Sequence, residues 1–333
     1  MKKLGKQTIK FDVPPSIVSV ASIVGPKEAN GPLAQYFDQC LDDEFWGEKT
    51  WEKSESKIIK ETVNMAISKS GIASSDIEYC FAGDLLNQCI SSSFGLRELN
   101  IPFIGIFGAC STFVEGLSLG AVFTESCAQN VICAASSHFC SAEKQFRFPL
   151  ELGNQRPPTS QWTVTGAGSA ILSKTGNGPY ITHITSGKIV DMGIKDANNM
   201  GAAMAPAALD TLICHFNDTG RSPNYYDAIL TGDLGHIWKD ILLELSADKG
   251  YNIKNNYNDC GVLIFDKESQ DTHSGGSGCG CCASVFSGYF YKQLKEQKIK
   301  RLLLIATGAL TNSTSSQQGE SIPGIAHAIS IEI

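Results

Sequence analysis

Cys110 is the residue whose type and position most strongly favour chemistry. It lies in the segment 108–112, Gly-Ala-Cys-Ser-Thr, between the apolar stretch 102–107 and a predicted helix from about 113 to 127. Amide groups at a helix N-terminus carry partial positive charge, which lowers the pKa of a thiol and attracts anions. The position therefore predicts a nucleophile or an anion site, and a packed cysteine at a tight turn is the structural alternative.

A cysteine nucleophile needs a histidine base, and the chain has six histidines, at 138, 183, 215, 236, 273 and 327. His138 and His236 follow predicted strand ends, where sites collect in open α/β sheets. The other four are expected to be structural or solvated. Signatures of serine hydrolases (Gly-x-Ser-x-Gly), of phosphate-binding loops and of His-Glu-x-x-His zinc proteases are missing.

The cysteines number twelve, and several lie within apolar stretches, where free cysteine behaves as a small buried hydrophobic residue. The N-terminus lacks the apolar segment of a signal peptide, so we expect a cytosolic protein without a disulfide framework. Cys279-x-Cys281-Cys282 does not have the spacing of a zinc site. The sequence therefore predicts no metal held by cysteines.

Length and composition limit the class of protein further. The 333 residues fit two ordinary domains or one large core, and 42% are hydrophobic. The net charge is −7 and the sequence pI is near 5.4, so nucleic-acid binding is not expected. No apolar run approaches the roughly 20 residues that span a bilayer.

Predicted strands and helices alternate along the chain, which indicates an α/β fold with a mainly parallel sheet and helical layers. The stretch 102–107 is apolar throughout and is predicted to be a central strand covered on both faces. The stretch 138–162 is predicted to be a long irregular insertion that shapes a site or an interface. The remaining predicted strands are 77–82, 131–137, 163–173, 180–191, 227–231, 301–307 and 325–333, and the predicted helices are 51–70, 85–99, 205–216, 237–245 and 282–297.

Two motifs recur in the same order in both halves of the chain. Gly-Asp-Leu ends a predicted strand at 83–85 and again at 232–234. A turn that opens a predicted helix occurs at 108–111 and again at 278–281. The shared order favours a duplication, with an N-terminal half of residues 1–192 and a C-terminal half of residues 193–333.

These features together resemble the thiolase superfamily, and most closely its ketoacyl synthase III branch. The resemblance implies duplicated halves, each with a mixed, mainly parallel sheet, in α-β-α-β-α layers. It places the nucleophile on Cys110 and the oxyanion turn on 307–311, with Gly308. It aligns Asp233 with the catalytic histidine, His236 with an asparagine of the same motif, and Cys279 with the catalytic asparagine.

The departures from the family pattern decide the predicted function. Thioester condensation needs histidine and asparagine donors near the reacting oxygen, and Asp233 and Cys279 supply neither well. An ionised Asp233 would also raise the pKa of the Cys110 thiol. We therefore expect a binding protein without catalytic residues and without a cofactor. An acyl-transferring enzyme that uses Cys110 with His138 or His236 is the alternative.

Further segments resemble the stage V sporulation AD family of spore formers: 82–88, 107–112, 136–138, 143–147, 203–208, 258–261 and 321–327. This resemblance implies binding of dipicolinic acid, free or as its calcium chelate. It implies membrane-embedded partners that move this molecule into the forespore and out at germination. It also implies a homodimer, and a cytoplasmic protein associated peripherally with the inner membrane of the forespore or spore.

Dipicolinate has a flat ring with two carboxylates, and the resemblance suggests where each would bind. The amides at Cys110, Ser111 and Thr112 would hold one carboxylate. His138, Lys144 or Arg147 would pair with the other, and arginine suits it best. Asp84 and Asp233 would suit calcium, although each could instead fix its own turn. The remaining expected pocket residues are Asn87, Ser136, Ser137, His236, Cys279 and Gly308. A structural adaptor with a vestigial pocket is a third possibility.

Overall fold

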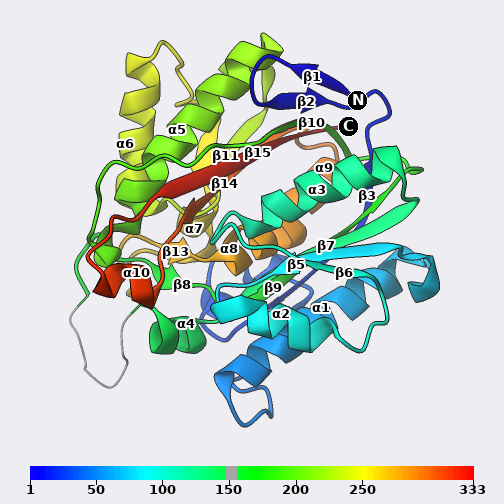
Figure 1. Cartoon of the computed structure of the whole chain (residues 1–333), viewed down its shortest axis with the longest axis horizontal. Helices are drawn as coiled ribbons and strands as arrows, with labels where there is room; N and C mark the ends of the chain where they lie inside the picture. Colours follow the sequence, from blue (N-terminus) through cyan, green and yellow to red (C-terminus); the bar gives the residue numbers. More distant parts are fainter. Residues whose placement is uncertain (148–155) are drawn as a thin grey trace.

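The computed structural model describes residues 1–147 and 156–333, and two groups of five strands form its centre (Figure 1). The first group is, in order, β3 (Ser16–Val24), β9 (Gly166–Ser173), β7 (Asn130–Ser137), β5 (Tyr79–Gly83) and β6 (Phe103–Gly105). The second is β10 (Tyr180–Thr185), β15 (Gly324–Glu332), β14 (Arg301–Ala309), β11 (Ala228–Thr231) and β12 (Tyr257–Asp259).

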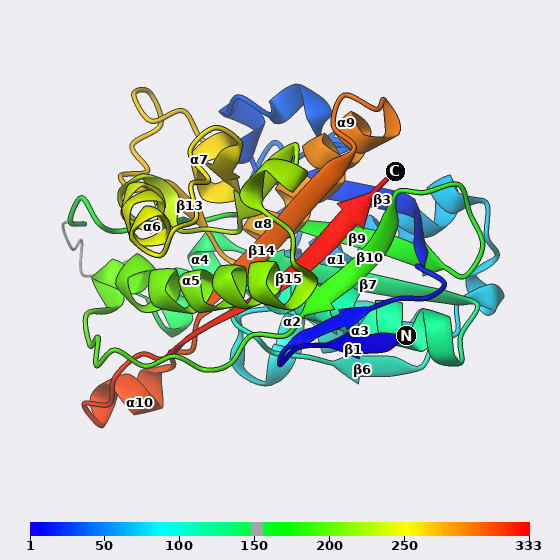
Figure 2. The same ribbon diagram turned by 90° about the horizontal axis from the view of Figure 1, so that it is seen from above.

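The strand pairing confirms the predicted duplication. In each group the first two neighbouring pairs are antiparallel and the next two are parallel. The two groups meet through one antiparallel residue pair, Tyr180 with Ser16. β10 precedes residue 192 but belongs to the second group, where it pairs with β15 (Figure 2). The boundary at 192 stays a prediction.

Helices form layers outside and between the two strand groups (Figure 1). α1 (Trp51–Ser70) and α2 (Ile90–Leu96) cover the outside of the first group, and α5 (Met200–Thr219) with α6 (Gly235–Asp248) covers the second. Between the groups, α3 (Thr112–Ser126) contacts strands of both, while α8 (Cys279–Val285) contacts α3 and the first group. The smaller elements are β1 (Lys2–Leu4), β2 (Thr8–Lys10), β4 (Gln39–Cys40), α4 (Phe139–Gln145), β8 (Trp162–Thr163), α7 (Cys260–Ile264), β13 (Gly276–Ser277), α9 (Tyr291–Lys295) and α10 (Ser313–Gln317).

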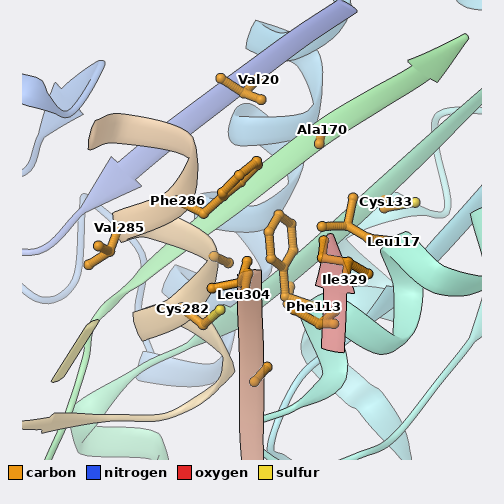
Figure 3. Close-up of a cluster of buried hydrophobic side chains, with 14 of the residues drawn as sticks. Val20, Phe113, Leu117, Cys133, Ala170, Cys282, Val285, Phe286, Leu304 and Ile329 are labelled. Atoms are coloured by element: carbon orange, nitrogen blue, oxygen red, sulfur yellow. The ribbon is translucent and has the colours of Figure 1, made fainter. Parts of the chain in front are cut away.

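The central helices are held by an apolar core that joins the two groups (Figure 3). Phe113 and Leu117 of α3 are fully buried and pack in the same cluster as Phe286, which follows α8. Leu304 of β14 and Ile329 of β15 close the cluster from the other side. Each such side chain contributes about 1.5–3 kcal/mol of burial free energy, so the turns that begin α3 and α8 are firmly positioned.

The helix predicted over residues 51–70 has the same bounds as α1. Thr50 caps its N-terminus by accepting a hydrogen bond from the Lys53 amide at 3.3 Å. Gly71 ends the helix in the left-handed conformation, with φ of 69°. Ile59 and Val63 are buried on the face that the apolar spacing selects.

Several predicted elements differ from the structure. The stretch 102–107 is wrong as a central strand, because β6 lies at the sheet edge with Phe103 39% and Phe107 48% exposed. An apolar run alone does not separate a covered strand from an edge strand.

The predicted helix 85–99 is shorter in the structure, where only α2 is helical, because positive φ angles at Gln88 and Cys89 interrupt it. The predicted helix 282–297 is α8, a π turn (Phe286–Phe290) and α9. The insertion 138–162 contains α4 and β8, and its residues 148–155 lie outside the described part.

A buried carboxyl group between α1 and β7 predicts how stability changes with pH. Glu55 accepts hydrogen bonds from Ser136 and Ser141, and burial raises its pKa from 4.5 to about 8. Between these two values the folded chain holds a proton that the unfolded chain releases. We therefore expect the Glu55 carboxyl to lower the free energy of unfolding by about 1.4 kcal/mol per pH unit across that window.

Urea unfolding of a Glu55→Gln variant from about pH 5 to about pH 8 checks this expectation. The variant should match the wild type at the acid end and become more stable than it at the alkaline end. Glu61→Gln on the same helix is the control and should run parallel to the wild type. A Glu55→Gln curve parallel to the wild type would contradict the buried-carboxyl account.

Candidate functional site

Cys110 lies in a tight turn between β6 and α3. Its side chain is 5% exposed, and Ala109 before it has a positive φ of 49°, which is uncommon for a residue with a Cβ atom. The C-terminal end of β14 approaches so closely that a Cβ atom on its residue Gly308 would lie 2.4 Å from the carbonyl oxygen of Gly108. Gly308 therefore lies against the Cys110 turn, as the family pattern predicts, and any side chain there would clash with backbone.

A hydrogen-bonded chain runs from Cys110 to a carboxylate and to an arginine. The Cys110 Sγ atom is 3.8 Å from Ser277 Oγ, which donates to Asp233 Oδ2 at 2.9 Å. Arg147 Nη2 donates to the same Ser277 oxygen at 2.7 Å. Thr307 Oγ1 and the Gly278 amide also donate to Asp233, at 2.6 and 3.0 Å. Residues from both halves of the chain therefore meet at the Cys110 turn.

The electrostatics of this group oppose a thiolate. Burial raises the pKa of Cys110 well above its ordinary value, and the Asp233 carboxylate adds to the rise, while Arg147 acts in the opposite direction. Burial also raises the pKa of Asp233, against the hydrogen bonds that it accepts. The expected effect of Asp233 on the thiol is therefore present in the structure. Cys110 is a neutral thiol at neutral pH.

The predicted carboxylate site on the α3 amides is wrong for Ser111 and Thr112. The Ser111 amide donates to the Gly108 carbonyl at 3.0 Å, and the Thr112 amide donates to the Ala109 carbonyl at 3.2 Å. Both hydroxyl groups also bond within the turn. Since these donors are already used by the turn itself, they are not available to a ligand.

The repeated Gly-Asp-Leu motif serves two different purposes. Asp84 accepts the Leu86 amide at 2.9 Å and both the amide and the hydroxyl of Ser92 at 2.7 Å, so it fixes its own turn. In the second half, Asp259 takes over that task and accepts the amides of Leu234 and Gly235, at 2.8 and 3.0 Å. Asp233 is thereby free to face the Cys110 turn. The structure supports the turn-fixing alternative for Asp84.

Other predicted site residues lie away from the Cys110 turn. Lys144 is exposed and pairs with Glu52 at 2.8 Å. Asn87 is exposed, and its amide donates to Gln145. His138 contacts the Glu44 carbonyl through Nε2 and the Cys140 amide through Nδ1. Since its ring is occupied by these contacts, His138 is not placed as a base for Cys110.

The remaining predicted residues have structural contacts. His236 is partly exposed in α6, and its backbone amide donates to Ser274. Cys279 is fully buried and its thiol donates to the Ser136 carbonyl at 2.9 Å, while Ser137 accepts the Gly280 amide. Burial raises the pKa of Cys279 well above its ordinary value, and the neighbouring Cys110 adds to the rise. Cys279 is therefore a buried neutral thiol near the Cys110 turn.

Two neighbouring cavities share Arg147 and Met200. One is lined by Cys110 together with Leu85, Phe107, Ala109, Phe146, Ala309 and Thr311. The other is lined by Arg147 and Arg156 together with Glu143, Ser160, Gln161, Ala197 and Asn198. Each has a free volume of about 10 Å³, which is room for roughly one water molecule.

The second cavity holds two arginines with unused donors. Arg147 Nε and Arg156 Nη1 are buried without hydrogen-bond partners among the described residues. Arg147 Nη1 donates to the Gln161 carbonyl at 3.1 Å, and the Arg156 guanidinium lies 4.3 Å from the Trp162 ring centroid. Burial lowers the pKa of Arg156, the carboxylates of Glu143 and Asp271 raise it, and the charge of Arg147 lowers it by a smaller amount. Two guanidinium groups with unused donors therefore line one cavity, together with the carboxyl group of Glu143.

The comparisons with known proteins decide the family. The model of the stage V sporulation protein AD family matches residues 5–332. Stage V sporulation protein AD of Bacillus subtilis (strain 168) is 42% identical over 333 residues, covering 100% of this chain and 98% of that protein. The chain belongs to the stage V sporulation protein AD family.

Solved structures place this family member in the ketoacyl synthase III fold. The priming β-ketosynthase of the R1128 polyketide pathway aligns with a TM-score of 0.61 at 13% identity, over 96% of this chain and 97% of the other. A variant of Xanthomonas campestris OleA gives a TM-score of 0.61 at 14% identity over 100% of both chains. The 3-oxoacyl-(acyl carrier protein) synthase III of Xanthomonas oryzae gives 0.58 at 13% identity, over 96% and 100%. The predicted thiolase-like fold is confirmed.

Three residues of the site were not selected from the sequence: Arg156, Gln161 and Ser277. Ser277 lies directly before the turn 278–281 that the family pattern had marked, whereas Thr307 belongs to the predicted oxyanion turn. Arg156 lies in the predicted insertion, and nothing in its local sequence separates it from a solvated arginine. Within the residues that the structure describes, no helix of this family member is long and apolar enough to cross a membrane.

The buried neutral thiol predicts slow alkylation. At neutral pH, iodoacetamide should modify the exposed Cys40 and Cys127 well before Cys110, because thiolate content and access both limit the reaction. Peptide mass spectrometry after timed quenching measures the order. Modification in denaturant, where all twelve cysteines react, is the control. Labelling of Cys110 ahead of Cys127 would contradict the account and favour an acyl-transferring enzyme.

Proposed function

We propose that this protein binds dipicolinic acid, free or as its calcium chelate, without catalysing a reaction. The observation that carries the proposal is a pair of half-buried arginines, Arg147 and Arg156. They line one cavity, and each has one buried donor without a hydrogen-bond partner among the described residues. Family membership supports a sporulation role for the site. The binding would serve transport of dipicolinate into the forespore and its release at germination.

The chemistry of the cavity suits a small dicarboxylate. A guanidinium group offers a fork of N–H donors that matches a carboxylate, and charge-assisted hydrogen bonds of this kind are stronger than neutral ones. Two guanidinium groups that line the same cavity repel each other. A dianion between them would relieve the repulsion and would accept hydrogen bonds from their unused donors. Arg147 would bind one carboxylate of dipicolinate and Arg156 the other.

The cavity must widen to admit the ring. Its free volume corresponds to about one water molecule, so a ligand enters only if lining side chains such as Met200 and Gln161 move. Met200 and Arg147 also line the Cys110 cavity, so outward movement of Met200 would join the two spaces. The ring would then lie against the Cys110 turn.

Calcium, where it accompanies the ligand, would enter as the chelate that dipicolinate itself forms. Asp84 and Asp233 already accept hydrogen bonds from their own surroundings, so neither is assigned to the metal.

The alternative of an acyl-transferring enzyme has less support. The thiol is buried and neutral, and Asp233 stands beside it without a histidine in contact with the Cys110 sulfur among the described residues. The solved ketoacyl synthases share the fold at 13–14% identity, and fold alone does not carry activity. Incubation with acyl-coenzyme A thioesters, followed by intact-mass measurement, should detect no acyl adduct on Cys110.

The proposed partners are membrane-embedded proteins of the same sporulation transport complex, which would hold this protein peripherally at the inner membrane from the cytoplasmic side. A second copy of the chain is a further proposed partner. The exposed edge of β6, with Phe103 and Phe107 exposed, supports a homodimer across that edge. Phe107 also lines the Cys110 cavity, so this edge is next to the site.

Calorimetric titration of the whole protein with dipicolinate, with and without calcium, tests the proposal. Saturable binding with one site per chain is the expected result. Isophthalate, which keeps both carboxylates but lacks the ring nitrogen, separates carboxylate recognition from chelation. Absence of binding under both conditions would overturn the proposed function and favour a structural adaptor.

A further inference from the structure

A stacked aromatic pair with two basic groups against it lies beside the arginine cavity. Trp162 of β8 stacks on Phe139 of α4, with ring centroids 3.7 Å apart and an angle of 3° between the ring planes. Lys27 Nζ is 4.0 Å from the Trp162 ring centroid, and Arg156 Cζ is 4.3 Å from it. We propose that Lys27 lies at the entrance of the arginine cavity and steers an anionic ligand toward Arg156.

The burial of the lining residues shows on which side the cavity reaches solvent. Four of them are buried, and the other four are half-buried: Arg147, Arg156, Ala197 and Asn198. Arg156 is the half-buried lining residue that also lies against Trp162. Lys27 lies against the same ring but does not line the cavity. The order from the surface inward is therefore Lys27, Arg156 and then Arg147.

The side chain of Lys27 has a charge that the rest of the described chain does not use. Its Nζ group has neither a hydrogen-bond partner nor an ion-pair partner among the described residues, and the side chain is half-buried. The backbone is fixed separately, because the Lys27 carbonyl accepts a hydrogen bond from Gln270 Nε2 at 2.7 Å. Burial lowers the pKa of Lys27, and the charge of Arg156 lowers it further. The two cations are therefore close enough to repel, and an approaching anion would be attracted by both.

The carboxyl groups that face Lys27 offset this charge only in part. They are Asp271, Glu28 and Glu44. Glu28 is neutral at pH 7, because burial raises its pKa to about 8, and burial also raises the pKa of Glu44. Asp271 is 81% exposed, so water and salt screen its charge.

The position of Lys27 outside the cavity decides which step of binding it affects. A charge at the rim of a site changes the association rate and its salt dependence, whereas a group in contact with the bound ligand changes the dissociation rate. Dipicolinate carries two negative charges at neutral pH, so a cation at the entrance raises its local concentration there. Lys27 is therefore a steering residue. This inference rests on the proposed binding of dipicolinate in the arginine cavity and adds the route by which the ligand arrives.

Stopped-flow mixing of the whole protein with dipicolinate, followed by tryptophan fluorescence, tests the steering role. Lys27→Gln should lower the association rate constant about three- to tenfold at low salt, near 0.01 M, where the Debye length is about 30 Å. At about 1 M salt, where the Debye length is about 3 Å, the variant and the wild type should associate at the same rate. The dissociation rate constant should stay unchanged, so calorimetry should show an affinity loss of the same size and the same salt dependence.

Two variants are the controls. Lys27→Arg keeps the charge and should keep the wild-type association rate at low salt. Lys57→Gln removes a lysine that makes the same kind of contact elsewhere, with Nζ 4.6 Å from the Trp46 ring centroid, in a surface depression between α1 and α2. It should change the association rate by less than about twofold. Circular dichroism should show that every variant is folded.

The outcomes separate the entrance from the binding site. A Lys27→Gln variant that associates at the wild-type rate at low salt would overturn the inference and leave dipicolinate binding intact. An affinity loss that lies in the dissociation rate and does not change with salt would also overturn it, since Lys27 would then contact the bound ligand. A wild-type protein without saturable dipicolinate binding would overturn the proposed function, and the steering role with it.

Discussion

Replacement of Arg147 or Arg156 by glutamine should weaken dipicolinate binding by tenfold or more, and the double variant should show no saturable binding. Both guanidinium groups line the same cavity and have buried donors without partners among the described residues. Loss of one partner from a buried charge pair costs about 2–5 kcal/mol of binding free energy, and every 1.4 kcal/mol is a factor of ten. Calorimetry with dipicolinate measures the change.

Controls separate recognition from folding. Arg147 also donates to Ser277 and to the Gln161 carbonyl, so thermal unfolding must show that its variants are folded. Arg97→Gln removes an arginine from the end of α2, in a different surface depression, and should bind like the wild type. Arg156→Lys keeps the charge without the fork and should lose less affinity than Arg156→Gln. Wild-type affinity in the double variant would contradict the site.

Asp259→Ala should lower the free energy of unfolding by about 3–5 kcal/mol. The Asp259 carboxylate is fully buried and accepts hydrogen bonds from the Thr231 hydroxyl and from the amides of Leu234, Gly235 and Val262. The variant leaves these donors buried without an acceptor. The turn that positions Asp233 would lose its anchor, so ligand binding should weaken as well.

Urea unfolding followed by circular dichroism measures this loss. Asp266→Ala is a matched control, because Asp266 also caps a turn, by accepting from Ser269, but is exposed. Its effect should stay near 1 kcal/mol or below. An Asp259→Ala variant within about 1 kcal/mol of the wild type would contradict the role of Asp259 as the buried anchor.

The overall fold was largely accessible from the sequence. Alternating strands and helices and the repeated Gly-Asp-Leu and turn motifs imply duplicated α/β halves, and the identical strand pairing in both groups confirms this. The edge position of β6 could not be predicted from the apolar stretch 102–107. Phe103 is exposed at the sheet edge, and Phe107 lines the Cys110 cavity, so neither residue belongs to the core. Positive φ angles at Gln88 and Cys89 shorten α2, and neither residue type signals such a break.

Only part of the site could be predicted from the sequence. The pattern around Cys110, Asp233 and Gly308 follows from local motifs, and the structure brings these residues together. Asp84 fixes its own turn, whereas the matching turn at Asp233 is fixed by Asp259, which is 26 residues further along the chain. A hydrogen bond between residues so far apart leaves no local signal in the sequence. The position of Arg156 depends in the same way on segments distant in sequence, since Arg147 and Met200 line its cavity.

A crystal structure of the protein grown with dipicolinate is the most direct test of the central claim. The account predicts ligand density between Arg147 and Arg156, with one carboxylate at each guanidinium group and with Met200 displaced toward a joined cavity. Density at any other place, with the two arginines in their present positions and their cavity closed, would contradict it.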